Sequence, residues 1–465
     1  MNRNIFRYLF FILFTAVIFT SCKVTRPYQQ PGIGSENLFR DAATTDTNTI
    51  ANLHWKELFT DTSLQRLIAE GIAHNPDLQM AFMRIQQSRA YYLQSGAALL
   101  PSLDANTGIT ISKLSEVQGM GIRNSSTQYQ LGLSSSWEAD IWGKLRSSKR
   151  ASFAALLQTE AASKTVQTGL VANIANFYFA LLALDEQLAI TQQTVANWDA
   201  TVQTMRALKE AARVTEAAVV QSEAQRYAAE VTIPDLKQSI KETENALSIL
   251  LGLPPSAIYR SKLQNQEVVE LLQTGVPAQL LANRPDVQEA ELNFRYYFEL
   301  TNVARAYFYP TLSITGSAGL SALSLSNFFD AGAIAASIGA GLTQPIFNRR
   351  ANKTRLEVAK AQQQEALLGF KNTLLIAGRE VSDAISLHET ALEKINIRSK
   401  QMEALRNSVA YSQELLENGF GNTNYTEIIT ARQSLLQAEL GSVNDRLQQL
   451  QAVVDLYRSL GGGWR

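Results

Sequence analysis

The chain has 465 residues, of which 42 are basic and 42 acidic, and its net charge of zero excludes the strongly basic surface of a nucleic-acid-binding protein. A hydrophobic content of 46% excludes an intrinsically disordered chain. Three histidines and one cysteine are too few to favour a metal site of the usual Cys/His kind.

Residues 1–21 have the organisation of a secretory signal peptide. Arg3 and Arg7 precede an apolar stretch over 8–20, which is shorter than the roughly 20 residues of a transmembrane helix. Ser21 and Cys22 follow, where cleavage is expected. This arrangement resembles a bacterial lipobox and makes Cys22 the predicted lipid anchor. The alternative is an ordinary signal peptide with an incidental cysteine.

An internal duplication covers most of the remaining chain. Asn-Pro-Asp-Leu-Gln at 75–79 recurs as Arg-Pro-Asp-Val-Gln at 284–288, and in each copy a second proline follows after 25 positions (101 − 76 and 310 − 285). The copies also end alike, with Leu-Leu-Gly-Leu-Pro at 250–254 and Ser-Leu-Gly-Gly at 459–462. The predicted divisions are an N-terminal segment over 22–62, a first repeat over 63–252, a connector over 253–283 and a second repeat over 284–465.

Each copy contains two stretches in which apolar residues alternate with small or polar residues, a pattern typical of half-exposed strands. They form two predicted hairpins, at about 101–138 and 310–344. Strands of about 10 residues with one apolar and one polar face suit a membrane and a wet lumen. A soluble sandwich with one core face is the alternative. Four strands are too few to close a membrane barrel, so we expect an obligate homo-oligomer, whose number of chains the pattern leaves open.

Long proline-free stretches predict long helices. Residues 144–211 contain one glycine and many good helix formers, and a helix of this length would extend about 100 Å. The pattern resumes after 213–215 and is interrupted by Pro234, where we expect a bend or a local break of the helix. The second copy predicts helices over about 352–417 and from 424 to 460. Apolar positions from 166 to 188 recur with a mean period of 22/6, about 3.67, which keeps packed helices nearly straight. The helices alone favour a coiled-coil rod, and their connection to two membrane hairpins favours a tunnel wall.

Several short motifs are spread along the chain. They are Trp-Lys-Glu-Leu-Phe-Thr-Asp at 55–61, Trp-Glu-Ala-Asp-Ile-Trp-Gly-Lys at 137–144, Gly-Val-Pro-Ala-Gln-Leu-Leu at 275–281 followed by Arg-Pro-Asp-Val at 284–287, Thr-Gln-Pro-Ile-Phe at 343–347 and Leu-Gly-Gly-Gly-Trp at 460–464. Together they resemble the TolC-like outer-membrane efflux proteins, in the lipoprotein branch with NodT- and OprM-like factors.

The resemblance covers nearly the whole mature chain and implies an α+β membrane protein. Its implied assembly is a homotrimer that forms a twelve-stranded β-barrel and an α-helical periplasmic tunnel, with a mixed equatorial region. Its implied function is a passive conduit from the periplasm to the outside, anchored by lipid in the outer membrane. The implied partners are a periplasmic adaptor (membrane fusion) protein and an inner-membrane pump.

The resemblance also indicates a periplasmic gate where the helix pairs turn. Two acidic residues three positions apart often ring the aperture in the family; Glu427 matches the first position, and Thr430 replaces the second. Three Glu427 carboxylates brought together could hold cations, whereas a solvated surface glutamate is the alternative. The first tip lacks the usual glycine. The candidate adaptor-docking residues are Gly419, Gly421, Asn422 and Thr423 at the second tip and Arg213 and Thr215 at the first.

Enzymatic motifs are missing from the sequence. There is no Gly-rich phosphate loop, no H-E-x-x-H, no G-x-S-x-G and no Cys/His pair, and His54, His74 and His388 are scattered. We therefore expect no catalytic residue, cofactor or metal. The main alternative function is a structural or adhesive coiled-coil outer-membrane lipoprotein. The polar strand faces carry Asp104 among small residues and indicate no particular substrate.

Overall fold

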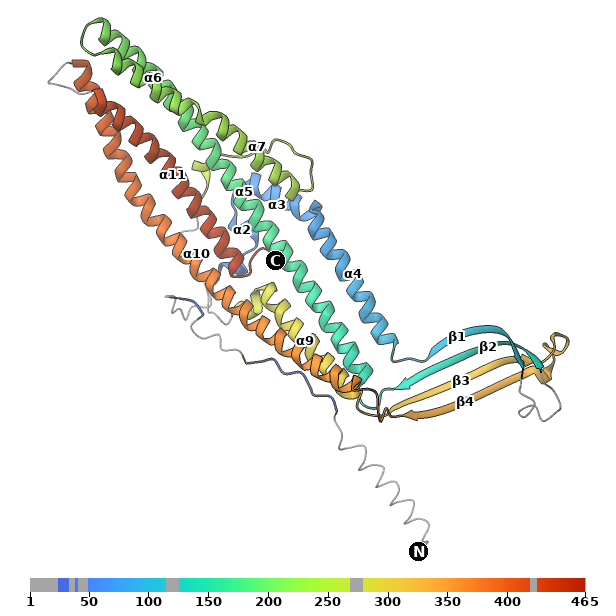
Figure 1. Ribbon diagram of the computed structural model, residues 1–465. Helices are drawn as coiled ribbons and strands as arrows, with labels where there is room; N and C mark the ends of the chain where they lie inside the picture. Colours follow the sequence, from blue (N-terminus) through green and yellow to red (C-terminus); the bar gives the residue numbers. More distant parts are fainter. Residues whose placement is uncertain are drawn as a thin grey trace. The chain divides into compact units, whose positions relative to one another are not determined.

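The computed structural model describes residues 24–32, 38–40, 49–113, 125–267, 279–418 and 425–464. The described elements fall into two runs of the same kind, each with short helices, two strands and long helices (Figure 1). The first run comprises α2 (Trp55–Leu58), α3 (Thr62–His74), α4 (Pro76–Ala97), β1 (Ser102–Lys113), β2 (Ser125–Ala139), α5 (Lys144–Glu210), α6 (Glu216–Glu230) and α7 (Thr232–Leu250). The second run comprises α8 (Leu280–Asn283), α9 (Pro285–Ala306), β3 (Thr311–Ala322), β4 (Ile334–Thr343), α10 (Ala351–Asn418) and α11 (Tyr425–Ser459).

Prolines mark the element boundaries as the sequence predicts. Pro76 and Pro285 open α4 and α9, where no backbone N–H is needed for the helix, and Pro101 and Pro310 directly precede β1 and β3. Pro234 does not break a helix from within, because α6 ends at Glu230 and Pro234 stands in the first turn of α7. The interruption predicted near this proline is therefore a restart of the helix at Thr232.

The two copies close in the same way, through a glycine in the left-handed conformation. Gly252 follows α7 with φ +71° and Gly461 follows α11 with φ +93°. Each glycine donates its N–H to a carbonyl of the last helical turn, to Ile249 at 3.0 Å and to Arg458 at 3.0 Å. Both positions are 209 residues apart (461 − 252). The duplication is thus visible in local backbone geometry.

In each copy, the residue before the proline that opens α4 or α9 holds the end of the last helix of the same copy, and we call these two contacts the joints. Asn75 donates from Nδ2 to the carbonyl of Leu250 at 2.9 Å, and Arg284 donates from Nη1 to the carbonyl of Ser459 at 3.0 Å. Asn75 and Arg284 are again 209 positions apart (284 − 75). The Arg-Pro-Asp-Val motif at 284–287 therefore has a structural role in the joint.

The four strands form one antiparallel sheet in the order β1-β2-β3-β4 (Figure 1). Strands β1 and β4 each pair on one side only, so both edges of the sheet are open within the chain. Large apolar side chains on the sheet are exposed, with Ile111 at 78% and Ile338 at 85%. A soluble sandwich would bury such a face. Strand β2 begins at Ser125, earlier than alternation predicts, because 125–128 contains only polar residues.

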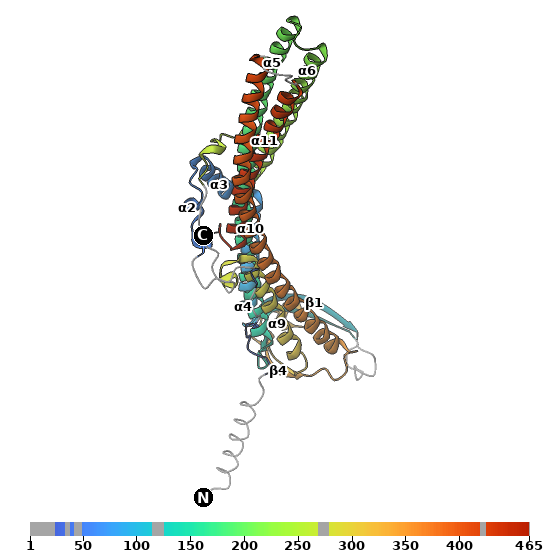
Figure 2. The same ribbon diagram turned by 90° about the vertical axis from the view of Figure 1, so that its left-hand side faces the viewer.

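The chain divides into two compact units, each taking residues from both copies. The strand unit comprises residues up to Gly32, 84–160 and 289–370, and the helical unit comprises 33–83, 161–288 and 371–465. In the helical unit, α6 runs back along the end of α5, and α11 runs back along the end of α10. The two helix pairs lie side by side in both views (Figures 1 and 2). The duplicated sequence therefore does not fold as two separate bodies.

Among the described helices, α5 alone is long and apolar enough to cross a membrane by length and composition. Its most apolar 18-residue window has a mean hydropathy of 1.3. Because 61% of that window is buried within the protein, it has the character of a packed core helix.

Candidate functional site: strand–helix junction, connector and helical tips

Aromatic side chains gather where the strands of the strand unit meet its helices. Trp137 and Trp142 donate their indole N–H groups to the carbonyls of Leu99 at 2.9 Å and Pro310 at 2.7 Å. The Trp142 ring lies 5.0 Å from that of Tyr309. Amphipathic rings with satisfied polar groups are typical of the boundary between membrane and water. The junction therefore has the chemistry of one rim of a membrane-spanning sheet.

The segment that follows the predicted anchor, over residues 24–32, is attached to α9 within the strand unit. Asn302 accepts the backbone N–H of Arg26 at 3.1 Å and donates to its carbonyl at 2.9 Å. Tyr28 donates its hydroxyl to Glu291 at 3.0 Å and packs edge-on against Phe298 at 5.5 Å. Cys22 itself lies outside the described residues. These contacts fix residues 24–32 beside the helix that leads into β3.

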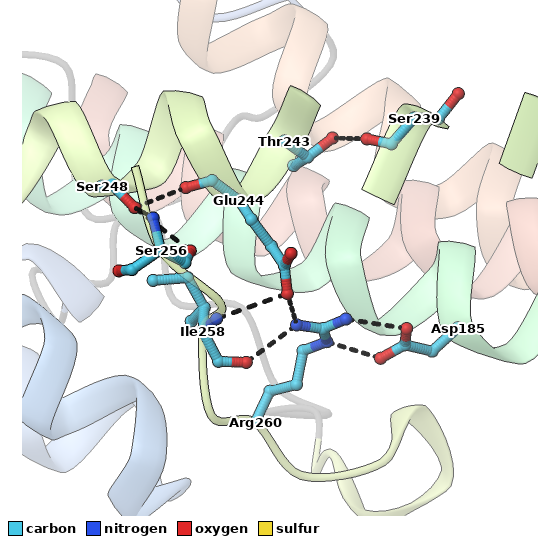
Figure 3. Close-up of polar contacts among 8 residues, drawn as sticks. All are labelled: Asp185, Ser239, Thr243, Glu244, Ser248, Ser256, Ile258 and Arg260. Atoms are coloured by element: carbon cyan, nitrogen blue, oxygen red, sulfur yellow. Dashed lines mark hydrogen bonds and ion pairs between the residues drawn. The ribbon is translucent and has the colours of Figure 1, made fainter. Parts of the chain in front are cut away.

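The connector is held to α5 and α7 by one arginine (Figure 3). Arg260 makes a two-pronged contact with Asp185 of α5, at 2.5 and 2.9 Å, and a further ion pair with Glu244 of α7 at 2.5 Å. Its Nη1 also donates to the carbonyl of Ile258 at 2.8 Å. The hydrogen bonds from Arg260 to Asp185, followed by those to Glu244, raise the arginine pKa despite burial. Arg260 therefore fixes the connector as a permanent cation between two carboxylates.

A second polar cluster joins the connector to the N-terminal segment and α5. The Asp61 carboxylate accepts hydrogen bonds from Tyr178 at 2.6 Å, Ser261 at 2.5 Å and Gln266 at 2.8 Å. Burial on its own would raise the pKa of Asp61, but the hydrogen bonds from these three side chains outweigh it and lower the pKa. Burial, followed by the hydrogen bond to Asp61, raises the pKa of Tyr178 to about 12. This Asp61 cluster, together with Arg260, is missed by sequence reasoning.

The first helical tip contains a strained alanine in the left-handed conformation. Ala212 adopts φ +56°, and it donates its N–H to the carbonyl of Lys209 at 2.8 Å while Arg213 donates to Leu208 at 2.8 Å. This bonding is the usual left-handed helix termination, which favours glycine. Arg213 and Thr215 are both exposed, and the hydroxyl of Thr215 makes no cap to α6. Both docking candidates of the first tip are thus accessible in the chain.

The second tip is described only from Tyr425 onward. Glu427 is exposed in the first turn of α11, where a negative charge is favourable near the helix N-terminus. Thr430 is also exposed, and its hydroxyl donates to the carbonyl of Thr426 at 2.8 Å. The other candidates of this tip, Gly419, Gly421, Asn422 and Thr423, lie outside the described residues.

Buried side chains bring the described parts of the two tips together. Ile428 and Ile429, directly after Glu427, belong to an apolar cluster with Trp198 and Met205 of α5 and Val219 of α6. Buried apolar contacts of this kind restrict the position of the first turn of α11. The apolar cluster therefore fixes the backbone on which Glu427 stands, while the side chain of Glu427 is exposed.

The pattern of one protein family matches the chain twice. The family is described as outer membrane efflux protein, and the matches cover residues 67–253 and 276–462. Their starts and ends are 209 positions apart (276 − 67 and 462 − 253), the same distance as between the two joints. The chain belongs to this family.

Individual members of the outer membrane efflux protein family are similar to the chain over nearly its whole length. Outer membrane protein OprJ of Pseudomonas aeruginosa is 29% identical over 463 residues, which are 97% of this chain and 95% of OprJ. The probable outer membrane lipoprotein SilC of Salmonella typhimurium is 25% identical over 456 residues, 97% of each chain. The open state of the MtrE outer membrane channel of Neisseria gonorrhoeae has a TM-score of 0.85 and 26% identity, and covers 96% of this chain and 99% of MtrE.

Family membership confirms the predicted fold class and function. The chain is an α+β outer-membrane protein built from a duplicated unit of helix, β-hairpin and long helix. It is the outer-membrane channel component of an efflux system, and the alternative of a purely structural lipoprotein is not supported. The roles of Cys22, Glu427 and the tip residues remain predictions.

Proposed function

We propose that three copies of the chain form one passive channel, with a twelve-stranded barrel that continues into an α-helical tunnel. The observation that carries this proposal is the four-stranded sheet with two open edges and an exposed apolar face. An open edge in lipid leaves backbone groups without partners, which costs several kcal/mol for each group. Closing the sheet through neighbouring copies removes both edges at once.

The proposed organisation follows the duplication. Residues 22–62 form the lipid-anchored start of the equatorial region, 63–252 and 284–465 form the two repeats, and 253–283 form the equatorial connector. The attachments of Arg260 and Asp61 support this role for the connector, because they tie it to α5, α7 and the N-terminal segment of the helical unit.

The proposed partners supply what a passive conduit lacks. An inner-membrane pump provides the energy, and a periplasmic adaptor connects it to the helical tips near Arg213, Thr215 and residues 419–423. The chain has no catalytic activity of its own in this proposal. The exposed positions of Arg213 and Thr215 support docking at the tip.

The proposed anchor is a lipid on Cys22. The attachment of residues 24–32 to α9 supports this proposal, because it holds the residues that follow Cys22 in the strand unit. Radiolabelled fatty acid should label the wild-type chain and leave the Cys22→Ser variant unlabelled. Equal labelling of both chains would contradict the anchor.

Single-channel recording in planar bilayers tests the proposed conduit. The purified chain should produce stepwise currents, because an assembled barrel and tunnel form a continuous aqueous path. Absence of currents, together with a chain that stays soluble after removal of its lipid, would favour the structural lipoprotein instead.

A further inference from the structure

A cavity of about 190 Å³ lies in the helical unit between α5, α10 and α11. Half of its lining is polar, from Thr194, Asn197, Arg432 and Glu439, and half is apolar, from Trp198, Val409, Leu435 and Leu436. A second cavity of about 40 Å³ is also lined by Arg432, together with Met205 and Ile428. The Arg432 side chain therefore lines two cavities between the packed helices.

The guanidinium of Arg432 has incomplete partners. Nη1 donates to the carbonyl of Asn197 at 3.2 Å and Nη2 to Oε1 of Gln413 at 2.9 Å, while Nε is buried and has no hydrogen-bond acceptor. Across the described parts of the chain, Arg432 forms no ion pair, although Arg260 and Arg284 each contact two carboxylates. Burial lowers the pKa of Arg432. Arg432 is partly buried, and a partly buried cation without a counter-ion favours an anionic partner.

The acidic residue beside the cavity does not neutralise Arg432. Glu439 contributes to the lining, but its carboxylate pairs with Arg406 at 3.1 Å. Arg432 therefore has no ion-pair partner among the described residues, and it shares the cavity with an apolar surface formed by Trp198, Val409 and two leucines.

We propose that this cavity binds a small organic anion, with its carboxylate on Arg432 and its apolar body against Trp198 and the leucines. The volume is below the roughly 300–1,000 Å³ of pockets for drug-sized ligands, so the site fits a single ring or a short chain. The guanidinium of Arg432 lines this cavity and supplies the positive charge that pairs with the carboxylate. The site is separate from the gate candidate Glu427 and does not depend on the proposed channel activity.

Binding at this site would stabilise the contact among three helices near the second tip. Trp198 lines the cavity and also belongs to the apolar cluster that holds Ile428 and Ile429. A ligand against Trp198 therefore contacts the same core that supports the first turn of α11. The anion acts in this proposal as a stabilising ligand of the tip region.

Calorimetric titration of the purified full chain in a non-ionic detergent tests the site, with sodium benzoate as the probe at neutral pH. Benzoate should bind saturably with one site per chain, and neutral benzyl alcohol should bind at least about tenfold more weakly, because it lacks the charge that pairs with Arg432. Arg432→Gln should also weaken benzoate binding about tenfold or more. The matched control is Arg379→Gln, which removes an exposed charge from α10 and should leave binding unchanged.

A second variant tests the space independently of the charge. Leu436→Phe keeps Arg432 but fills part of the cavity, so it should also abolish benzoate binding. Circular dichroism verifies that each variant keeps its helices, and Leu436→Phe decides the question if Arg432→Gln does not fold. The proposal is overturned if benzoate does not bind saturably, if benzyl alcohol binds equally well, or if a folded Arg432→Gln or Leu436→Phe variant binds benzoate like the wild type.

Discussion

Replacement of Gly461 by alanine should destabilise the second repeat at the joint where its last helix ends. Gly461 has φ +93°, in a region that costs an L-residue about 1–2 kcal/mol. A Cβ at this position would also overlap the backbone carbonyl of Asn283, which cannot move as a side-chain end could. Forced packing of one extra carbon costs about 1–3 kcal/mol more. The expected loss is therefore about 2–5 kcal/mol of the free energy of unfolding.

Thermal unfolding of the purified protein, followed by its far-ultraviolet circular dichroism, measures this loss. Gly461→Ala should lower the midpoint by several degrees, and Gly252→Ala should do the same, because its Cβ would lie 2.5 Å from the carbonyl oxygen of His74. Gly169→Ala is the matched control. It introduces the same methyl group inside α5, where no atom of the described residues lies within 4 Å of the added carbon, and alanine is the better helix former.

The comparison between these variants decides whether the joint requires glycine. Gly169→Ala should unfold at or slightly above the wild-type temperature. If Gly461→Ala and Gly252→Ala unfold together with Gly169→Ala, the reasoning from left-handed backbone and close packing is refuted.

Three further predictions concern the tips and the Asp61 cluster. Ala212→Gly should raise the free energy of unfolding by about 0.5–1 kcal/mol, because glycine adopts the left-handed turn without strain, and an unchanged denaturation midpoint would contradict this. Glu427→Ala should change single-channel conductance or cation selectivity, whereas Glu403→Ala, at another exposed acidic residue, should not; identical effects would contradict the gate assignment. The raised pKa of Tyr178 gives stability that is present below pH 10 and is lost as the pH rises through about 12. Tyr178→Phe should therefore reduce the loss of stability between pH 10 and about 12. An equally steep loss in the variant would count against the hydrogen bond to Asp61.

The sequence predicts the strands and helices well because their signals are local. Period-two alternation identifies the four described strands. Pro101 and Pro310 directly precede β1 and β3, and Pro76 and Pro285 open α4 and α9. The start of β2 is missed because Ser, Thr and Gln at 125–128 carry no apolar alternation. The position of Pro234 in a first turn is also missed, because the pattern alone does not show that α6 ends four residues earlier.

The polar clusters depend on contacts between distant residues, which a single sequence does not reveal. Ser261 reaches Asp61 across 200 positions, and Arg260 reaches Asp185 across 75. Asp61 stands in a motif that supports the family resemblance, but the motif does not indicate its partners. The cavity lined by Arg432 exists only when α5, α10 and α11 pack together, so the proposed anion site is a property of the fold.

The central claim is that the open edges of one four-stranded sheet are closed by two further copies of the chain. Native mass spectrometry of the purified protein, released from detergent, measures the number of chains directly. The account predicts a complex of three chains, with four strands contributed by each. A stable single chain, or a complex of two or four chains, would contradict it.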